Sequence, residues 1–188
     1  GLDAPNAMIG WVPFLMGPNF TLEKESGVSA FTHILRSEST GSIHISSADA
    51  TRPPAISFNF LSAQLDRDVT LEATQLLRNI MKAPPLEGIV TKELTPGPDI
   101  ASAEEVLDWV RRTAETTYHP VGTCKMGNDP MAVVDDQLRV HGMEGLRVAD
   151  ASIMPTLTSG NTNAPSIMIG EKASQMVLEA ARGEAMAA

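Results

Sequence analysis

The sequence predicts an α+β fold in which an antiparallel sheet packs with helices. Stretches of the first third alternate apolar and polar residues with the period of a strand, and later stretches repeat apolar residues at helical spacing. The last third ends in an apolar helix that follows a polar turn. With 188 residues, the chain is long enough to bury a substantial core.

The N-terminal third predicts a loop followed by strands. Residues 1–27 contain Gly, Pro and scattered large apolar side chains without a clear period, which indicates a loop or lid segment. Strand-forming residues follow at 28–35, and polar and apolar residues alternate at 42–46 and 55–60. We expect a half-buried antiparallel sheet with one face toward solvent or a ligand.

Two helices are expected in the middle of the chain. Apolar residues recur at helical spacing over 68–82. A second helix, 102–114, starts with Ser102 and Glu105, whose spacing is that of a capping box. The Pro- and Gly-containing stretch 93–99 between them predicts a loop.

The last third of the chain contains shorter polar and Gly-containing segments. Residues 145–150 predict a short strand that closes on an acidic residue. The polar turn 159–165 leads into a third helix, and Pro165 suits its first position because the missing N–H has no partner there. Residues 183–188 form a tail of low complexity.

Charge and cysteine content restrict the class of protein. Lys and Arg number 14 and Asp and Glu 23, and the net charge of −9 disfavours nucleic acid or an anionic membrane as a partner. The single Cys124 excludes an internal disulfide and fits a reducing compartment. Because no apolar run has membrane-spanning length and the start lacks an export signal, we expect a cytoplasmic location without membrane association.

Four histidines are candidates for chemistry. His33, His44 and His141 lack a neighbouring partner pattern, so a structural or surface role is expected for them. His119 lies in the Gly- and polar-rich loop 118–127, and loops held by a rigid frame often carry catalytic side chains. From composition alone, a catalytic and a structural His119 both remain open.

The turn 159–165 is the second candidate site. Free N–H groups and the dipole at a helix start favour an anionic ligand atom. Alternatively, Thr162 or Asn163 caps the helix by binding its first-turn amides. No zinc spacing, Gly-x-Ser-x-Gly elbow or phosphate-binding loop is present, so no metal is expected. Cys124 could be a nucleophile, but a small buried filler is the favoured interpretation.

Several motifs in a fixed order resemble one family. They are His-Pro-Val-Gly-Thr-Cys-Lys-Met-Gly at 119–127, Ala-Val-Val-Asp at 132–135, Leu-Arg-Val-His-Gly at 138–142, 145–155 and Gly-Asn-Thr-Asn-Ala-Pro at 160–165, preceded by the strand region 41–61. Together they closely resemble the C-terminal part of the glucose-methanol-choline (GMC) oxidoreductases, among them choline dehydrogenase- and alcohol oxidase-like enzymes.

The resemblance implies an FAD-dependent enzyme that oxidises an alcohol. In the family, the histidine that corresponds to His119 takes the hydroxyl proton while the carbon gives a hydride to flavin N5. Such general base catalysis contributes on the order of a hundred- to ten-thousandfold. The residue that faces the base across the substrate oxygen corresponds to Asn161, with Asn163 as second choice. The residues expected near FAD are Asp150, Ala151, Thr162, Asn163 and Pro165.

One feature of the family is missing from the chain. The family binds the ADP portion of FAD on a Gly-x-Gly-x-x-Gly turn, and these 188 residues contain none. We therefore expect residues 28–118 to form a substrate-binding domain and residues 119–182 to complete an FAD-binding domain that is otherwise absent. Its partner would be that FAD-binding part, in the same protein or in a separate chain, and the fragment alone should be inactive.

Two alternatives stay open. A lyase of the same family would keep FAD as a structural group and cleave a cyanohydrin with the same histidine. A non-catalytic half-fold module would complement a separate FAD-binding chain. The sequence does not separate oxidase from dehydrogenase, and its acidic balance is a faint hint toward a cationic alcohol such as choline.

Overall fold

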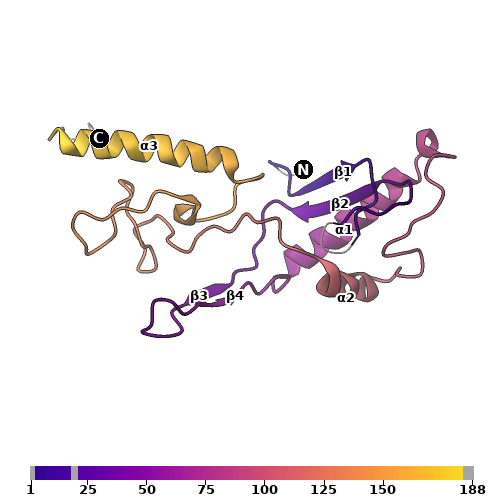
Figure 1. Cartoon of the computed structure of the whole chain (residues 1–188), viewed down its shortest axis with the longest axis horizontal. Helices are drawn as coiled ribbons and strands as arrows, with labels where there is room; N and C mark the ends of the chain where they lie inside the picture. The colour runs from indigo at the N-terminus through magenta and orange to yellow at the C-terminus, as the bar shows by residue number, and fades with distance from the viewer. Residues whose placement is uncertain (1–2, 18–20, 184–188) are drawn as a thin grey trace. The chain divides into compact units, whose positions relative to one another are not determined.

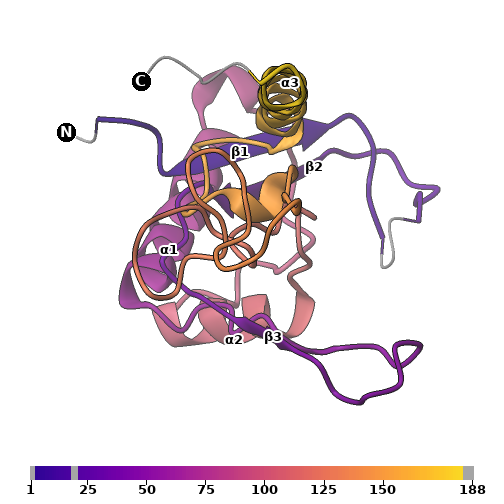
Figure 2. The same cartoon turned by 90° about the vertical axis from the view of Figure 1, so that its left-hand side faces the viewer.

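The computed structural model describes residues 3–17 and 21–183 of the chain. Its elements group into two compact units, which Figures 1 and 2 show from two sides. One unit comprises residues 1–41 and 58–117, and the other comprises residues 42–57 and 118–188. The chain combines helices with antiparallel strand pairs, so the predicted α+β class is confirmed.

The first unit packs helices on a two-stranded antiparallel ladder. β1 (Ala7–Val12) pairs with β2 (Ser29–Ile34), and α1 (Gln64–Met81) contacts both strands (Figure 1). α1 ends before a 3-10 turn, η2 (Pro84–Leu86), and α2 (Ala103–Thr113) packs on α1. The buried apolar side chains of this unit are Leu35, Val69, Ala73 and Val106.

The sequence did not predict β1. A loop was expected over residues 1–27, but Ala7–Val12 form a strand. Gly10 lies in the middle of β1, opposite Phe31 of β2. A Cβ atom at Gly10 would overlap the Phe31 ring, so the ring occupies the space that a side chain would need. A glycine inside a strand removes the alternation by which strands are identified, and it marks a close approach.

Replacing Gly10 with alanine is expected to destabilise the chain by about 1 kcal/mol, because the Phe31 ring must leave its place on β1. Urea unfolding measures the change. Gly170→Ala is the matched control: it lies in a helix with open space around the new methyl group, so it is expected to be neutral or stabilising. An unchanged or raised urea midpoint for Gly10→Ala would contradict the expectation.

A buried carboxylate anchors the start of α1, which begins earlier than its apolar stripe predicts. Asp66 is 1% exposed and accepts hydrogen bonds from Ser37 Oγ at 2.5 Å and from the backbone N–H groups of Glu38 and Ser39, both at 2.9 Å. Ser39 Oγ in turn accepts from the N–H of Ala63 at 3.0 Å. The segment after β2 is thereby fixed to the first turn of the helix.

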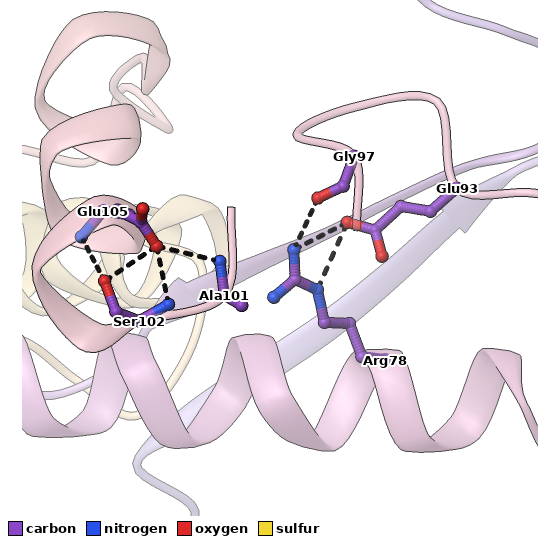
Figure 3. A network of polar contacts seen from close by, with 6 residues as sticks. All are labelled: Arg78, Glu93, Gly97, Ala101, Ser102 and Glu105. Atoms are coloured by element: carbon purple, nitrogen blue, oxygen red, sulfur yellow. Dashed lines mark hydrogen bonds and ion pairs between the residues drawn. The ribbon is translucent and has the colours of Figure 1, made fainter. Parts of the chain in front are cut away.

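Two polar networks hold α2 and the loop before it (Figure 3). The predicted capping box is confirmed: the N–H of Glu105 donates to Ser102 Oγ at 3.3 Å, and the N–H of Ser102 donates to Glu105 Oε2 at 2.9 Å. Arg78 Nη2 of α1 donates to Glu93 Oε1 at 2.8 Å and to the carbonyl of Gly97 at 3.2 Å. The loop expected between the helices is thus tied to α1.

The second unit contains a short ladder, β3 (Ser42–His44) paired antiparallel with β4 (Ala55–Ser57). The strands expected over 42–46 and 55–60 are confirmed as a pair but are shorter. All of their residues are exposed, so the expected half-buried pattern is wrong for this ladder. A two-stranded ribbon with no layer packed on it has no buried face.

The rest of the second unit surrounds a separate core. α3 (Asn163–Ala181) contacts the 3-10 turn η3 (Ala151–Ile153), and Figure 2 views α3 nearly end-on. The buried cluster between them consists of Val134, Leu138, Ile153, Met154, Ile169 and Ala173. In the part of the chain that the structure describes, no helix is long and apolar enough to cross a membrane.

The strand expected over 145–150 is wrong. Only a single bridge, between Arg139 and Arg147, forms in this stretch. Gly145 has a φ of 72°, which is the left-handed conformation of a turn, and Asp150 already caps η3. Val148 packs on the core from an irregular backbone rather than from a ladder, whereas Leu146 is exposed.

Candidate active site

His119 lies in a loop that backbone hydrogen bonds fix to η3. The N–H of Cys124 donates to the carbonyl of Ser152 at 3.0 Å, and the N–H of Met126 donates to the carbonyl of Ile153 at 2.7 Å. The Met126 side chain also packs against the buried cluster. An irregular loop is therefore held rigidly from the side of the core.

Two residues with left-handed backbone conformation bracket the histidine. Tyr118 has a φ of 60° and Gly122 a φ of 87°. For Tyr118 this conformation costs on the order of 1–2 kcal/mol, because its Cβ crowds the backbone. Strain of this kind persists only where the surroundings enforce it, and it is common at functional sites.

The ring of His119 is bound by a side chain 43 residues further on. His119 Nδ1 lies 2.9 Å from Thr162 Oγ1, and Thr162 is 8% exposed. Thr162 is the N-cap residue of α3, yet its side chain makes no capping hydrogen bond. The alternative in which Thr162 caps the helix is therefore wrong.

The other residues expected at the site surround this contact along the chain. Asn161 and Asn163, on either side of Thr162, are exposed. Pro165 was expected at the first position of the helix, but α3 begins at Asn163, so Pro165 is in its first turn and not at its start. Within 3–17 and 21–183, the Asn161 side chain makes no hydrogen bond. The structure thus brings His119 to Thr162, and among the described residues no hydrogen bond joins His119 to Asn161.

Asp150 and Ala151 lie at the start of η3. Asp150 Oδ1 accepts a hydrogen bond from the N–H of Ser152 at 2.7 Å and so caps the turn. Ala151 is the first residue of η3 and packs against the buried cluster. This cap holds the same turn to which the His119 loop is bound.

Asp135 gives a structural reason for the 132–135 motif. Its Oδ1 accepts from the N–H groups of Gln137 and Arg139, both at 2.9 Å, and its Oδ2 pairs with the Arg139 guanidinium. Burial alone would raise the pKa of the Asp135 carboxyl, but the hydrogen bonds and charge of Arg139, with the N–H of Gln137, lower it on balance. Asp135 thus holds a turn.

The remaining histidines differ from His119 in their surroundings. His44 is exposed on β3, and the exposed His141 binds the carbonyl of Gly127 through Nε2 at 2.9 Å. Cys124 is half-buried beside the backbone of η3. Among the described residues, no three His, Cys, Asp or Glu side chains gather as they would around a metal ion.

Comparison with known proteins decides the family. A family model described as GMC oxidoreductase matches residues 37–170, which include the His119 loop, η3 and the first turns of α3. The chain belongs to the GMC oxidoreductase family. The predicted family and its C-terminal part are confirmed, and one solved structure that the chain resembles is an FAD-dependent oxidoreductase from Chaetomium thermophilum.

Curated relatives of this GMC chain are longer. An oxygen-dependent choline dehydrogenase of Cronobacter sakazakii is 45% identical over 169 residues, which cover 89% of this chain and 30% of that protein. One of Escherichia coli is 44% identical over 174 residues, covering 92% of this chain and 31% of the relative. The chain therefore spans about a third of the length of these relatives.

Solved GMC structures share the fold. Pyridoxine 4-oxidase from Mesorbium loti is 33% identical with a TM-score of 0.84, over 93% of this chain and 35% of that one. A fungal aryl-alcohol oxidase is 30% identical with a TM-score of 0.71, over 79% of this chain and 25% of that one. This chain covers only part of each solved protein, as it covers only part of each curated relative.

The contact between His119 and Thr162 was not predicted from the sequence. Thr162 was expected near FAD because of its place at the helix start, whereas its hydroxyl contacts His119. No spacing rule connects two residues so far apart in the sequence. The turn 159–165 had been singled out as a candidate site, and the family resemblance paired His119 with the neighbouring Asn161, but neither indicated a bond to Thr162.

Proposed function

We propose that the chain is the C-terminal part of an FAD-dependent enzyme that oxidises an alcohol, with His119 as the base. The observation that supports this most is the bond of His119 Nδ1 to Thr162, in a loop fixed to η3. A ring held through Nδ1 presents Nε2 to a ligand. A neutral imidazole nitrogen in this position can take the proton of a substrate hydroxyl.

The start of α3 fits FAD as the cofactor. Thr162 leaves the first-turn amides without a side-chain cap, and the first turn contains no acidic residue. Uncapped N–H groups and the positive end of the helix dipole stabilise an electron-rich ring atom. FAD would supply the hydride acceptor, and Asp150, Ala151, Thr162, Asn163 and Pro165 are the residues that would lie along it.

Asn161 has a different role in the proposal. Its exposed amide precedes Thr162, so it can donate a hydrogen bond to the substrate oxygen as the hydroxyl proton leaves. An amide does not take up a proton near neutral pH, so Asn161 cannot replace His119 as the base. Asn163 is the second candidate for this role.

The rest of the FAD site would come from outside these residues. The chain spans about a third of the choline dehydrogenases that it resembles, and it contains no Gly-x-Gly-x-x-Gly turn for the ADP portion. We place the substrate-binding domain at 28–118 and the part that completes the FAD-binding domain at 119–182. The cytoplasmic location also remains a prediction.

Choline is the first alcohol to test. The relatives are named choline dehydrogenases, and a net charge of −9 favours a cationic substrate over an anionic one. When the complete FAD-bearing protein is mixed anaerobically with choline or other primary alcohols, the flavin absorbance is expected to bleach. Flavin that stays oxidised with every alcohol would exclude the proposal, and cleavage of a cyanohydrin under the same conditions would identify a lyase.

The chain by itself is expected to be inactive. Added FAD has no phosphate-binding turn here, so alcohol and an electron acceptor together should give no acceptor reduction above the rate of free FAD. Spectrophotometric assay of the acceptor measures this. Turnover that depends on the chain would contradict the expectation, while recovery of turnover on adding a separate FAD-binding chain would favour complementation.

A further inference from the structure

The Thr162 hydroxyl lies within hydrogen-bond distance of the His119 ring and does not cap α3, the helix that Thr162 precedes. Threonine is a favoured N-cap residue because its hydroxyl can accept from the first-turn amides. Thr162 occupies this position in α3 but makes no capping bond, and its Oγ1 lies 2.9 Å from His119 Nδ1. The position of the hydroxyl therefore fits the imidazole ring and not the local backbone.

Both partners of this hydrogen bond are anchored to the same core. α3 is held by Ile169 and Ala173, which are buried in one cluster with Ile153 of η3. The loop of His119 is bound through its backbone to η3. Thr162 is buried and β-branched, so its χ1 angle has few alternatives. The geometry of the bond is set before any ligand arrives.

A hydroxyl is a suitable partner for a ring that changes protonation. A neutral imidazole has one N–H donor and one acceptor nitrogen, whereas the protonated ring has two donors. If Nδ1–H donates to the hydroxyl oxygen, the lone pair lies on Nε2, and the same hydrogen bond persists after Nε2 takes a proton. A neutral hydroxyl also fixes the ring without the charge that a carboxylate would bring.

We propose that Thr162 is a positioning residue: its hydroxyl accepts the Nδ1 proton of His119 and so selects the tautomer whose lone pair is on Nε2. The importance of this tautomer for the reaction rests on the proposed function. The hydrogen bond and the tautomer are properties of the chain alone, and they can be measured without FAD.

The tautomer is tested by ¹⁵N NMR of the chain labelled at histidine, at a pH where the rings are neutral. His119 is expected as the Nδ1–H tautomer, with its signals assigned by His119→Asn. Thr162→Val keeps the shape and removes the hydroxyl, so it is expected to move His119 toward the Nε2–H form that prevails in free histidine. Thr162→Ser is expected to retain the Nδ1–H form.

Thr74→Val is the matched control. It removes a hydroxyl that donates to the carbonyl of Thr70 at 2.8 Å in α1, and it is expected to leave the His119 signals unchanged. If Thr162→Val disturbs the helical circular dichroism, the comparison of Thr162→Ser with Thr162→Ala gives the same test. His119 signals that are identical with and without the Thr162 hydroxyl would overturn the proposal.

The complete FAD-bearing protein gives the second measurement. Thr162→Val is expected to lower the rate of anaerobic flavin reduction by roughly ten- to a hundredfold, with little change in KM, and Thr162→Ser is expected to restore most of it. An unchanged rate, or a loss that Thr162→Ser does not restore, would overturn the positioning role. His119→Asn without effect would instead overturn the proposed function, so the two failures are distinguishable.

Discussion

Replacing His119 with asparagine is expected to slow reduction of the flavin by alcohol about a hundred- to ten-thousandfold in the complete protein. Asparagine keeps a polar side chain in the loop but cannot take up the hydroxyl proton. Stopped-flow absorbance of the flavin under anaerobic conditions measures the rate. Flavin content measured in the same samples separates a slow reaction from a lost cofactor.

Two variants make this result specific. His44→Asn is the matched control, because His44 is exposed on β3 and the same substitution there should leave the rate unchanged. Asn161→Ala should slow the reaction less than His119→Asn, since it removes a hydrogen-bond donor and leaves the base in place. Equal losses for Asn161→Ala and His119→Asn would contradict these separate roles.

Replacing Asp66 with alanine is expected to destabilise the first unit by about 3 kcal/mol. The carboxylate accepts three hydrogen bonds, and its removal leaves the N–H groups of Glu38 and Ser39 without their acceptor. Urea unfolding measures the loss. Asp68→Ala is the control on the same helix: Asp68 is exposed, so a change of less than about 0.5 kcal/mol is expected.

The contribution of Asp66 to the free energy of unfolding should also depend on pH. Burial by itself would raise the pKa of the Asp66 carboxyl, but the hydrogen bonds from Ser37, Ser39 and Glu38 outweigh it and hold the pKa below its ordinary value. The unfolded chain therefore binds the proton more readily than the folded chain. The contribution is complete above a pH of about 4 and is lost as the pH falls toward the folded-state pKa.

Asp66→Asn tests this dependence. It keeps the shape and one acceptor oxygen but does not titrate, so the difference in stability between the wild type and Asp66→Asn should shrink as the pH falls below about 4. Unfolding curves at several pH values measure the difference. A constant or growing difference toward low pH would show that ionised Asp66 does not stabilise the fold.

The sequence predicted the elements whose local signals agree with their packing. The apolar stripe of α1, the Ser102–Glu105 capping box and the antiparallel pairing of β3 with β4 were all available from spacing and turn residues. In the two helices the structure uses the residues that carried the signal: Val69 and Ala73 of the α1 stripe are buried, and Ser102 and Glu105 form the cap of α2.

Two of the failures, at β1 and at the start of α1, have a common physical cause, which is a partner from another segment. Gly10 interrupts the alternation of apolar and polar residues by which β1 could have been predicted. Its place on the strand is covered by the ring of Phe31, the residue with which it pairs. α1 begins early because Asp66 binds a segment that follows β2. Local period cannot reveal either partner.

The candidate site was likewise predicted only in part. The family motifs identified His119 and the start of α3, and these are the two segments that the structure joins. The residue that joins them, Thr162, could not be assigned from spacing, since a helix cap and a ring contact are equally available to a threonine at that position. In the structure Thr162 contacts the ring and makes no helix cap.

The order of the two units along the chain has a consequence for synthesis and cleavage. The chain passes from one unit to the other three times, near residues 41, 57 and 117. The unit that contains the β3–β4 hairpin can therefore form only after residues beyond 117 have left the ribosome. Closing the intervening stretch costs conformational entropy, and this cost grows only with the logarithm of the number of residues in the stretch. For the same reason, no single proteolytic cut releases the second unit intact, since its residues 42–57 stay with the first unit after a cut near residue 117.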